Sequence, residues 1–288
     1  MNFTKPISDI IRERTSRRTY SGKPLNDNMR KKVIELIENH DLKSPFSERA
    51  GTVRFKLVNI PEFEPNEKKK LGTYGFIKGA QNFIVGAVEK SQYGREHYGY
   101  LMESLILAVT DLGLGTCWLG GFFNRSLFSA KINRTYDEIV PAITPIGYSI
   151  QRSTRENLIR SFAKADKRLS WDQLFFEGTL TNPIMKNHIG EYSKLLEMVQ
   201  IAPSAGNKQP WRIIKLGNKN IFHFYTINPK DGRFMKYSKF RSIDIGIAVN
   251  HFDLTAKELG IEGNWIFENP QILGTEDLLY KITWQGDI

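Results

Sequence analysis

The sequence lacks the features that define several large classes of protein. Cys117 is the single cysteine in 288 residues, which excludes an intrachain disulfide and a CxxC metal site. No apolar run reaches the roughly 18 residues that a membrane-spanning helix needs. The opening segment "MNFTKPISDIIRERTSRRTY" has no apolar core like that of a signal peptide. The 5 histidines form no HxxxH pattern, so we predict no metal. We expect a cytoplasmic protein without a membrane partner.

The composition of the chain is that of a globular protein with excess positive charge. The chain is 40% hydrophobic and 25% charged, enough to build a sizeable core. The net charge of +10 is compatible with nucleic acid, an anionic membrane surface or a phosphorylated small molecule as partner. The basic residues form no long block and no stripe interleaved with aromatics. We expect most of them to be solvated and predict no nucleic-acid partner.

Apolar patterns predict helices over residues 24–40 and within 98–122, and strands over 52–60, 82–88 and 143–150. Asn26 is the expected N-cap of the first helix. The second helix is apolar on most sides, which indicates burial, and Gly113 and Gly115 are expected to stop it. The charged segment "NEKKKLG" (66–72) is expected to be a helix end or a loop.

The second half of the chain resembles the first. "DLGLGTCWL" (111–119) matches "ELGIEGNWI" (258–266), each at the end of an apolar helical pattern. "VIELIENH" followed by "TVRFKLV" has its counterpart in "LLEMVQIAPSAGNKQPWRIIKL". These matches predict an internal duplication, with halves at 1–168 and 169–288 that pack as a pseudo-dimer within one compact protein.

The halves differ in two polar segments. "RERTSRRTY" (12–20) has no counterpart in the second half, and "APSAGNKQPW" (202–211) has only "KSPFSERAG" opposite it in the first. The second segment suits either a plain helix–strand connection or a loop that lets a flat ligand approach the backbone. "GLGTCWLGG" is not a dinucleotide fingerprint, because a helix precedes it and an extended segment follows. One composite site, with half of its groups in each unit, is the expectation.

Three motifs, "RTSRRTY", "APSAGNKQPW" and "LGLGTCWLGGF", resemble those of the nitroreductase family of FMN-dependent oxidoreductases. The resemblance covers most of the chain and is greatest to the branch in which two family units are fused. It implies an α+β fold of two fused pseudo-repeats. Each would have a central, mainly antiparallel sheet flanked by helices, and they would form an intrachain pseudo-dimer with one FMN.

The resemblance also implies which residues bind the flavin. Arg14 and Ser16 would bind the phosphate, and Arg18 would lie near the pyrimidine edge, with Lys78 as a further candidate. A backbone N–H near Gly120 would point at N5, although a glycine-rich turn is the alternative for this segment. Lys167 and Arg168 resemble a basic pair that closes on the phosphate, or are surface charges. The full set implied is Arg14, Thr15, Ser16, Arg18, Lys78, Trp118, Leu119, Gly120, Gly121, Lys167, Arg168, Pro203, Ser204, Ala205, Asn207 and Gln209.

Neighbouring residues have simpler interpretations. Arg17 is expected to be a solvated surface charge, Cys117 a small buried hydrophobe, and Trp211 a core residue that holds the loop.

By the same resemblance, FMN takes a hydride from NADH or NADPH at N5 and passes electrons to a small-molecule acceptor, a nitroaromatic, a quinone or another flavin, in a ping-pong cycle. The protein supplies binding and orientation, so no catalytic side chain is nominated. A monomer would suffice. The alternatives are a non-catalytic flavin-binding sensor or storage protein, and a basic nucleic-acid-binding protein without flavin.

Overall fold

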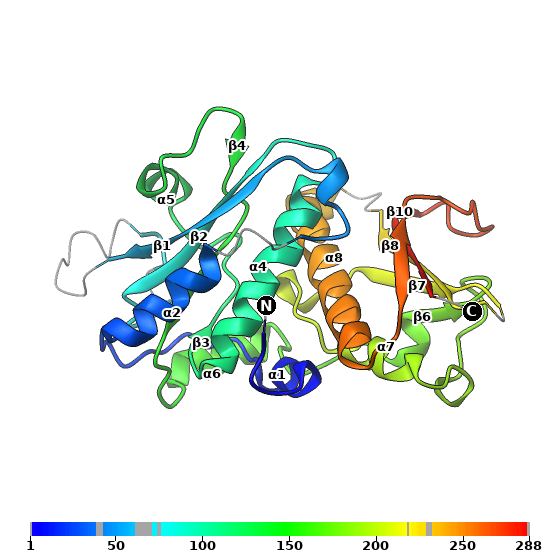
Figure 1. The fold of residues 1–288 in the computed structure, drawn as a ribbon, viewed down its shortest axis with the longest axis horizontal. Helices are drawn as coiled ribbons and strands as arrows, with labels where there is room; N and C mark the ends of the chain where they lie inside the picture. Colours follow the sequence, from blue (N-terminus) through cyan, green and yellow to red (C-terminus); the bar gives the residue numbers. More distant parts are fainter. Residues whose placement is uncertain are drawn as a thin grey trace. The chain divides into compact units, whose positions relative to one another are not determined.

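The structure is a computed structural model that describes residues 2–38, 43–60, 71–73, 76–217, 219–228 and 232–286, without the side chains of 232–239. The chain divides into two compact units, Met1–Ala165 and Asp166–Ile288. The first contains the blue to green elements of Figure 1 and the second the yellow-green to red ones. The sequence analysis placed the boundary after residue 168.

The first unit is built on an antiparallel sheet. Its strands are β1 (Val53–Asn59), β2 (Asn82–Glu89), β3 (Gly115–Thr116), β4 (Glu138–Ile139) and β5 (Ile143–Gly147). The order is β1-β2-β5-β3, with β4 also paired to β2. The helices are α1 (Ile7–Glu13), α2 (Asp27–Ile37), α4 (Gly94–Asp111), α5 (Arg125–Lys131) and α6 (Thr154–Phe162), with a short 3-10 turn η1 (Ser47–Arg49). β2 is buried from Asn82 to Val88, as its continuous apolar run predicts.

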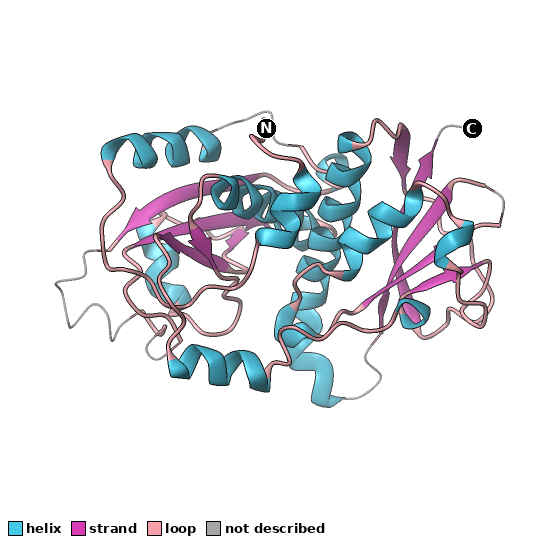
Figure 2. Ribbon diagram, turned by 90° about the horizontal axis from the view of Figure 1, so that it is seen from below, coloured by secondary structure: helices cyan, strands magenta, loops and turns pink. Residues whose placement is uncertain are grey.

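The second unit has a sheet of the same kind. Its strands are β6 (Phe175–Glu177), β7 (Trp211–Lys215), β8 (Ile221–Ile227), β9 (Gly263–Ile266) and β10 (Leu278–Gly286), in the order β6-β7-β8-β10-β9. The pairing is antiparallel except between β6 and β7. The helices are α7 (Tyr192–Gln200) and α8 (Gly232–Glu258), with 3-10 turns η2 (Trp171–Gln173), η3 (Lys186–His188) and η4 (Ala205–Asn207). In both units helices pack against the sheet (Figure 2).

The two units repeat one pattern. In each, a helix leads into two antiparallel strands, then a long helix, a short strand and a final strand: α2-β1-β2-α4-β3-β5 in the first and α7-β7-β8-α8-β9-β10 in the second. The sheet orders correspond strand for strand, β1-β2-β5-β3 with β7-β8-β10-β9. This confirms the prediction of an α+β fold made of two fused repeats.

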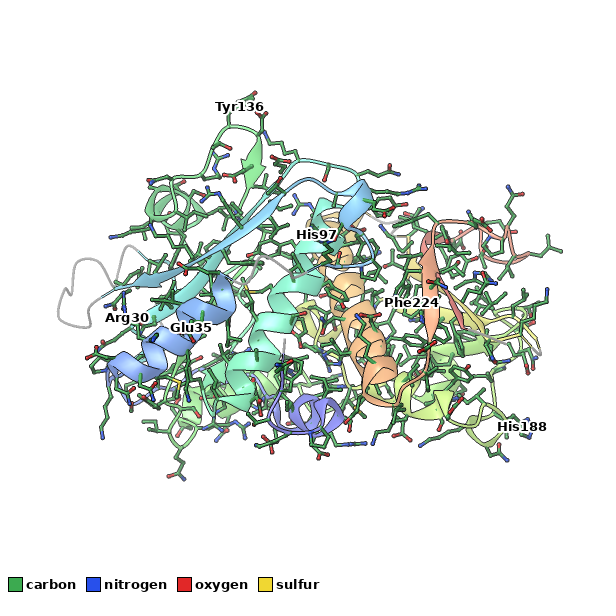
Figure 3. The ribbon with its side chains drawn as sticks, viewed as in Figure 1. Arg30, Glu35, His97, Tyr136, His188 and Phe224 are labelled. Carbon is green, nitrogen blue, oxygen red and sulfur yellow. The ribbon has the colours of Figure 1, made fainter. Side chains whose placement is uncertain are left out.

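Each unit has a core of buried apolar residues. Apolar residues of β2, β5 and α5, such as Phe83, Ile143 and Phe128, form the cluster over one face of the first sheet. In the second unit Phe222, Phe252 and Trp284 lie with ring centroids 5.3–5.9 Å apart. Such aromatic packing gives large apolar burial in a small volume. Phe224, which lies in β8 with Phe222, is also fully buried and is labelled in Figure 3.

Local sequence signals locate most element ends. Asn26 caps α2 by accepting a hydrogen bond from the Met29 N–H (2.8 Å), as predicted. α4 begins before the predicted start and ends at Asp111, followed by Gly113 with φ +81°. This is the left-handed residue that commonly follows a helix. The predicted end of the first helix, 39–40, and most of the segment 66–72 lie outside the described residues.

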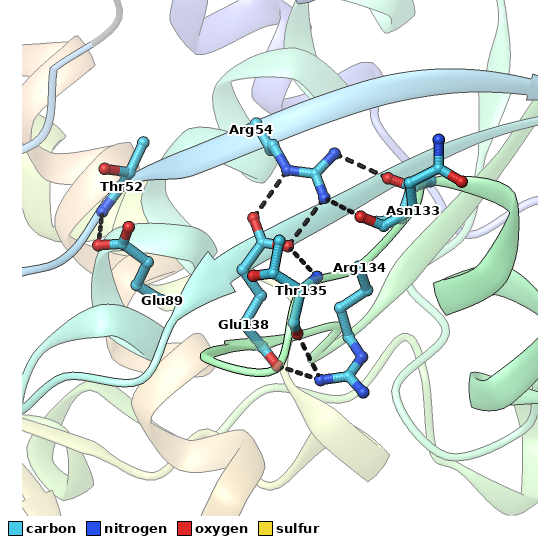
Figure 4. A network of polar contacts seen from close by, with 8 residues as sticks. Thr52, Arg54, Glu89, Asn133, Arg134, Thr135 and Glu138 are labelled. Atoms are coloured by element: carbon cyan, nitrogen blue, oxygen red, sulfur yellow. Dashed lines mark hydrogen bonds and ion pairs between the residues drawn. The ribbon is translucent and has the colours of Figure 1, made fainter.

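A polar network fastens β4 and the loop before it to β1 (Figure 4). The Arg54 guanidinium donates to both Glu138 carboxylate oxygens (2.7 and 2.8 Å) and to the Asn133 carbonyl (3.1 Å). The Thr135 N–H also donates to Glu138 (2.9 Å). These donors, Arg54 first, lower the pKa of Glu138 to about 2. Tyr136, within the loop, stays 85% exposed (Figure 3).

Candidate functional site

The arginine-rich segment of the first unit is extended and pairs with two other segments. It follows α1 directly. The Arg17 N–H donates to the Thr116 carbonyl (2.7 Å), and the Lys78 N–H donates to the Arg18 carbonyl (2.8 Å). Parallel bridges accompany both contacts. The structure thus gathers three segments that are far apart along the chain: "RTSRR", the residues around Lys78, and the start of "TCWLGG".

Two glycines permit this close approach. Gly79 has φ +76°, and a Cβ there would lie 2.4 Å from the Tyr20 carbonyl oxygen. A Cβ at Gly115 would lie 2.8 Å from the Ser149 Cβ and 3.2 Å from the Arg17 Cβ. Real Cβ atoms essentially never come within 3.0 Å of another heavy atom. The close approach therefore depends on glycine, against backbone at Gly79 and against side chains at Gly115.

A buried charge pair lies behind the arginine-rich segment. The side chains of Arg14 and Glu103 are 6% and 0% exposed, and the Arg14 Nε lies 3.8 Å from the Glu103 Oε1. The other carboxylate oxygen accepts a 2.6 Å hydrogen bond from the Trp118 indole N–H. Burial lowers the pKa of Arg14, and the Glu103 carboxylate opposes this effect. Glu103 therefore links the arginine-rich segment to "TCWLGG".

Two donor atoms of the Arg14 guanidinium have no acceptor among the described residues. Its Nε and Nη1 are buried and make no hydrogen bond within the described residues. Buried N–H groups normally have partners, and a charged donor left without one is costly. Guanidinium donors of this kind suit the anionic oxygens of a phosphate or carboxylate group, to which they make charge-assisted hydrogen bonds.

Other residues of the arginine-rich segment line the same neighbourhood. Thr15, Ser16 and Arg18 are half-buried, and Thr15 accepts hydrogen bonds from Arg152 and Arg160. The Arg18 Nη1 is buried without a hydrogen-bond partner in the described part of the chain. Cys117 is 1% exposed, and burial raises the pKa of its thiol. It is therefore a buried small residue, as its sequence context predicted.

The backbone of "WLGG" is held rigidly. Leu119 and Ile143 exchange two hydrogen bonds of 2.9 Å, and the Gly120 carbonyl accepts from Arg125 (2.8 Å). The Leu119 side chain belongs to the hydrophobic core, so it presents only backbone to any ligand. Gly121 is exposed, and a Cβ built there meets nothing within 4 Å. The two glycines are therefore the accessible part of this segment.

In the second unit, the loop before β7 has an unusual backbone. Gly206, Asn207 and Gln209 have φ of +57°, +55° and +47°. Glycine and asparagine tolerate this left-handed region best. The Ser204 carbonyl accepts from the Asn207 N–H (3.0 Å), and the Ser204 hydroxyl accepts from the Gln209 N–H (2.8 Å). Pro203 and Ala205 are half-buried beside them.

The carboxamides of this loop hold the basic pair. The Asn207 amide donates to the Lys167 carbonyl (2.8 Å), and its oxygen accepts from the Arg168 guanidinium (3.3 Å). The Gln209 amide oxygen accepts from the Leu169 N–H (2.8 Å). The structure therefore brings Lys167 and Arg168 to the loop. It uses both carboxamides within the unit, where the sequence analysis assigned them to a ligand.

A buried carboxyl group supports the loop from α8. Asp244, 3% exposed, accepts a hydrogen bond from the Ala205 N–H (3.0 Å). Burial raises its pKa to about 8, although this bond and the nearby Arg241 favour the charged form. On the β7 side Trp211 is fully buried, as predicted.

Two buried carboxyl groups, Glu103 in the first unit and Asp244 in the second, were not identified from the sequence. Each is a carboxylate within an apolar helical run, "LMESLILAV" and "SIDIGIAV". A charged residue at such a position is rarely buried without a partner, and this was the available signal.

Metal ligands and membrane spans give no further candidates. Within the described residues, His, Cys, Asp and Glu form no group of three or more that could hold a metal ion. None of the described helices has the length and apolar character needed to cross a lipid bilayer.

The fold and these two polar groups place the chain in the class of nitroreductase-like α+β proteins with fused repeats. The chain belongs to the family described as "Putative TM nitroreductase", whose model matches residues 6–256.

One solved structure gives the same result for the fold, and two others are similar over about half of the chain. A nitroreductase-like protein from Thermotoga maritima is 20% identical, with a TM-score of 0.60 over 99% of this chain and 95% of that one. An FMN-dependent nitroreductase from Clostridium difficile is 20% identical over 50% of this chain and 88% of that one (TM-score 0.41). An NADH dehydrogenase/NAD(P)H nitroreductase from Parabacteroides distasonis is 18% identical over 52% and 90% (TM-score 0.42). No functionally curated protein matches the sequence significantly.

Proposed function

We propose that the chain is an FMN-dependent oxidoreductase that takes electrons from NADH or NADPH and passes them to a small aromatic acceptor. One observation carries most of the proposal: the buried guanidinium of Arg14, whose Nε and Nη1 have no hydrogen-bond partner in the described residues. The family membership supports the redox class, and the phosphate of a flavin supplies acceptors for these donors.

The residues of the first unit fit a flavin phosphate and ring. Arg14 would donate to the phosphate, with Thr15 and Ser16 beside it. Arg18, with its buried unpartnered Nη1, would offer positive charge to the pyrimidine edge, where the reduced ring is anionic. Gly120 and Gly121 present backbone without side chains, so a planar ring can lie against them.

The residues of the second unit fit a supporting role. Ser204, Asn207 and Gln209 hold the loop in its left-handed conformation and keep Lys167 and Arg168 on it. We propose that this loop binds flavin through its backbone and its basic residues. One FMN per chain is the stoichiometry that the sequence predicts.

When bound, FMN would supply the redox chemistry, a hydride taken from the nicotinamide and passed to the acceptor. The chain's own contribution is to bind and orient. Arg14 neutralises the phosphate, Arg18 raises the positive potential near the pyrimidine edge, and the paired backbone of "WLGG" fixes the surface on which the ring rests.

An exposed aromatic pair supports an aromatic acceptor. Phe122 follows Gly121 directly and is 56% exposed. Its ring stacks on that of Phe76, with centroids 4.0 Å apart and planes at 21°. A planar acceptor could extend this stack, because offset aromatic pairs are favoured beyond their area burial.

The experiment that tests the proposal is reconstitution followed by anaerobic reduction. The full chain is mixed with FMN, separated from free flavin, and its visible spectrum is recorded before and after addition of NADH or NADPH. Retained FMN that either nucleotide bleaches, and that an added quinone or nitroaromatic reoxidises, would support an oxidoreductase. FMN that is retained but never bleached would favour the sensor or storage alternative. A chain that retains no FMN would contradict the proposal.

A further inference from the structure

Helix α6 brings two further arginines to the arginine-rich segment. Arg152 precedes the helix and Arg160 lies in its last turn. The Arg152 Nη2 and the Arg160 Nη1 both donate to the Thr15 hydroxyl oxygen, at 3.1 and 3.3 Å. A hydroxyl can accept two hydrogen bonds, but it carries no charge to offset two guanidinium groups. Two guanidinium groups, one from each end of α6, therefore converge on the Thr15 hydroxyl of the arginine-rich segment.

The start of α6 is fixed by a buried carboxylate. Glu156 is 2% exposed and accepts from the Arg18 N–H (3.1 Å) and the Thr19 hydroxyl (2.7 Å). The Ser153 hydroxyl caps the helix by accepting from the Glu156 N–H. The Arg152 Nε lies 3.7 Å from the same carboxylate. The position of α6 against the arginine-rich segment is thus specified by side chains of both.

Positive charge gathers in this neighbourhood. Five arginines, at positions 14, 17, 18, 152 and 160, lie in or against the segment, and two buried glutamates, 103 and 156, contact it. The cations affect one another, since Arg160 contributes to lowering the pKa of Arg14. Like charges held together in a partly buried place are unfavourable unless an anion joins them.

We propose that Arg152 and Arg160 complete, with Arg14, a receptor for a phosphate monoester dianion centred on the Thr15 hydroxyl. Its occupant is the 5′-phosphate of FMN or the 2′-phosphate of NADPH. The FMN source rests on the proposed function. It is favoured because the unsatisfied donors of Arg14 belong to the same cluster. Lys167 and Arg168 belong to the second unit, which holds them on its own loop.

The test compares flavins that differ only in the phosphate. The full chain is titrated with FMN and with riboflavin, following the quenching of flavin fluorescence. The variants are R160Q and R152Q/R160Q, and the control is R155Q, an exposed arginine of the same helix. Loss of each charge-assisted contact should weaken FMN binding about ten- to a hundred-fold, while riboflavin binding and R155Q stay unchanged. R160K should recover part of the loss.

The same variants are titrated with NADPH and NADH to separate the two phosphate sources. A loss confined to FMN identifies the flavin phosphate. A loss confined to NADPH supports the receptor with the nucleotide as its occupant. Unchanged binding of both in R152Q/R160Q, with wild-type melting temperature, would overturn the proposal. So would an equal loss for FMN and riboflavin, which indicates a structural role.

Failure of the proposed function is distinguishable from failure of this inference. A wild-type chain that binds neither flavin contradicts the function. Inorganic phosphate is then the probe. Protection of the wild type against thermal unfolding by phosphate, absent in R152Q/R160Q, would support the receptor, and equal behaviour of the two proteins would overturn it.

Discussion

Removing the carboxylate of Glu103 should reveal how strongly the arginine-rich segment is anchored to α4. Glu103 is fully buried, faces the Arg14 guanidinium at 3.8 Å and accepts from the Trp118 indole at 2.6 Å. The variant E103Q keeps an oxygen acceptor for Trp118 but removes the negative charge. The variant E103A removes both. The pair of variants therefore separates the ion pair from the hydrogen bond.

The magnitudes follow from the two contacts. Breaking a buried ion pair by removing one partner costs roughly 3–5 kcal/mol. The 3.8 Å separation is too long for a direct hydrogen bond, so we expect E103Q to lose about 3 kcal/mol of unfolding free energy. E103A should lose about 5 kcal/mol, because the Trp118 N–H is also left without its charged acceptor. The two contributions share one group and need not be additive.

Urea unfolding followed by tryptophan fluorescence measures these differences. S104A is the matched control. Ser104 lies next to Glu103 in the same helix, is 3% exposed, and is uncharged, and its hydroxyl donates to the Tyr100 carbonyl (3.2 Å). It should lose no more than about 1 kcal/mol. If E103Q and E103A unfold at the wild-type urea concentration, or no earlier than S104A, Glu103 does not anchor the segment.

Three further predictions concern other contacts. The depressed pKa of Glu138 means that its stabilisation is present above pH 4.5 and is lost as the pH falls towards 2. E138Q should therefore lose about 1–2 kcal/mol of unfolding free energy at pH 7, a modest loss because the Arg54 side chain is 40% exposed. In urea unfolding, the difference in stability between E138Q and wild type should disappear in acid. The raised pKa of Asp244 has the opposite sign. Wild-type stability should fall as the pH rises from about 4 to about 8, by up to about 1.4 kcal/mol per pH unit. If the stability of D244N falls with pH as steeply as that of wild type, the raised pKa of Asp244 is not the cause. G121A should leave the melting temperature unchanged, because its methyl meets nothing within 4 Å, yet weaken FMN binding about tenfold or more by overpacking against the ring. Unchanged FMN affinity would mean that Gly121 does not face the flavin.

Elements with strong local signals were predictable from the sequence. β2 and α4 each contain a long apolar stretch, and Asn26 and Gly113 mark helix ends by backbone requirements that are local. The strand predicted over 143–150 ends instead at Gly147. Beyond it the backbone turns to the arginine-rich segment, where the Ser21 N–H donates to Tyr148 and the Ile150 N–H to Thr19. Residues 148–150 thus pair with the arginine-rich segment and do not extend β5. This choice depends on tertiary contacts, which cannot be read from the apolar pattern of the sequence.

The motifs of the site were recognisable, but their partners were not. Arg14 and Thr15 could be nominated from a short pattern. The groups that hold them, Glu103, Arg152 and Arg160, lie about 90 to 145 positions away. The arginines of α6 occur in a basic segment that looks like any solvated helix face. Only the docking of α6 by Glu156 turns two of them towards Thr15 while Arg155 stays exposed.

The two repeats share a topology but differ in the side chains of the connection that leads into their first long strand. The connection that leads into β1 is closed by apolar and buried contacts: Phe46 is fully buried and stacks on Tyr93 (centroids 5.9 Å), and Ser44 bonds to His97 (2.7 Å). Burial lowers the pKa of His97 to about 4, so this imidazole is neutral at pH 7.

The corresponding connection into β7 is closed by two carboxamides, three left-handed residues and a basic pair. The sheets are ordered identically, yet one connection presents a packed aromatic and the other presents polar groups. A fold match alone would have assigned both the same role. The difference in side chains predicts that replacing "GNKQ" by the residues of the first connection would preserve the sheet and abolish flavin binding. Loss of the fold itself would show that the loop is structural instead.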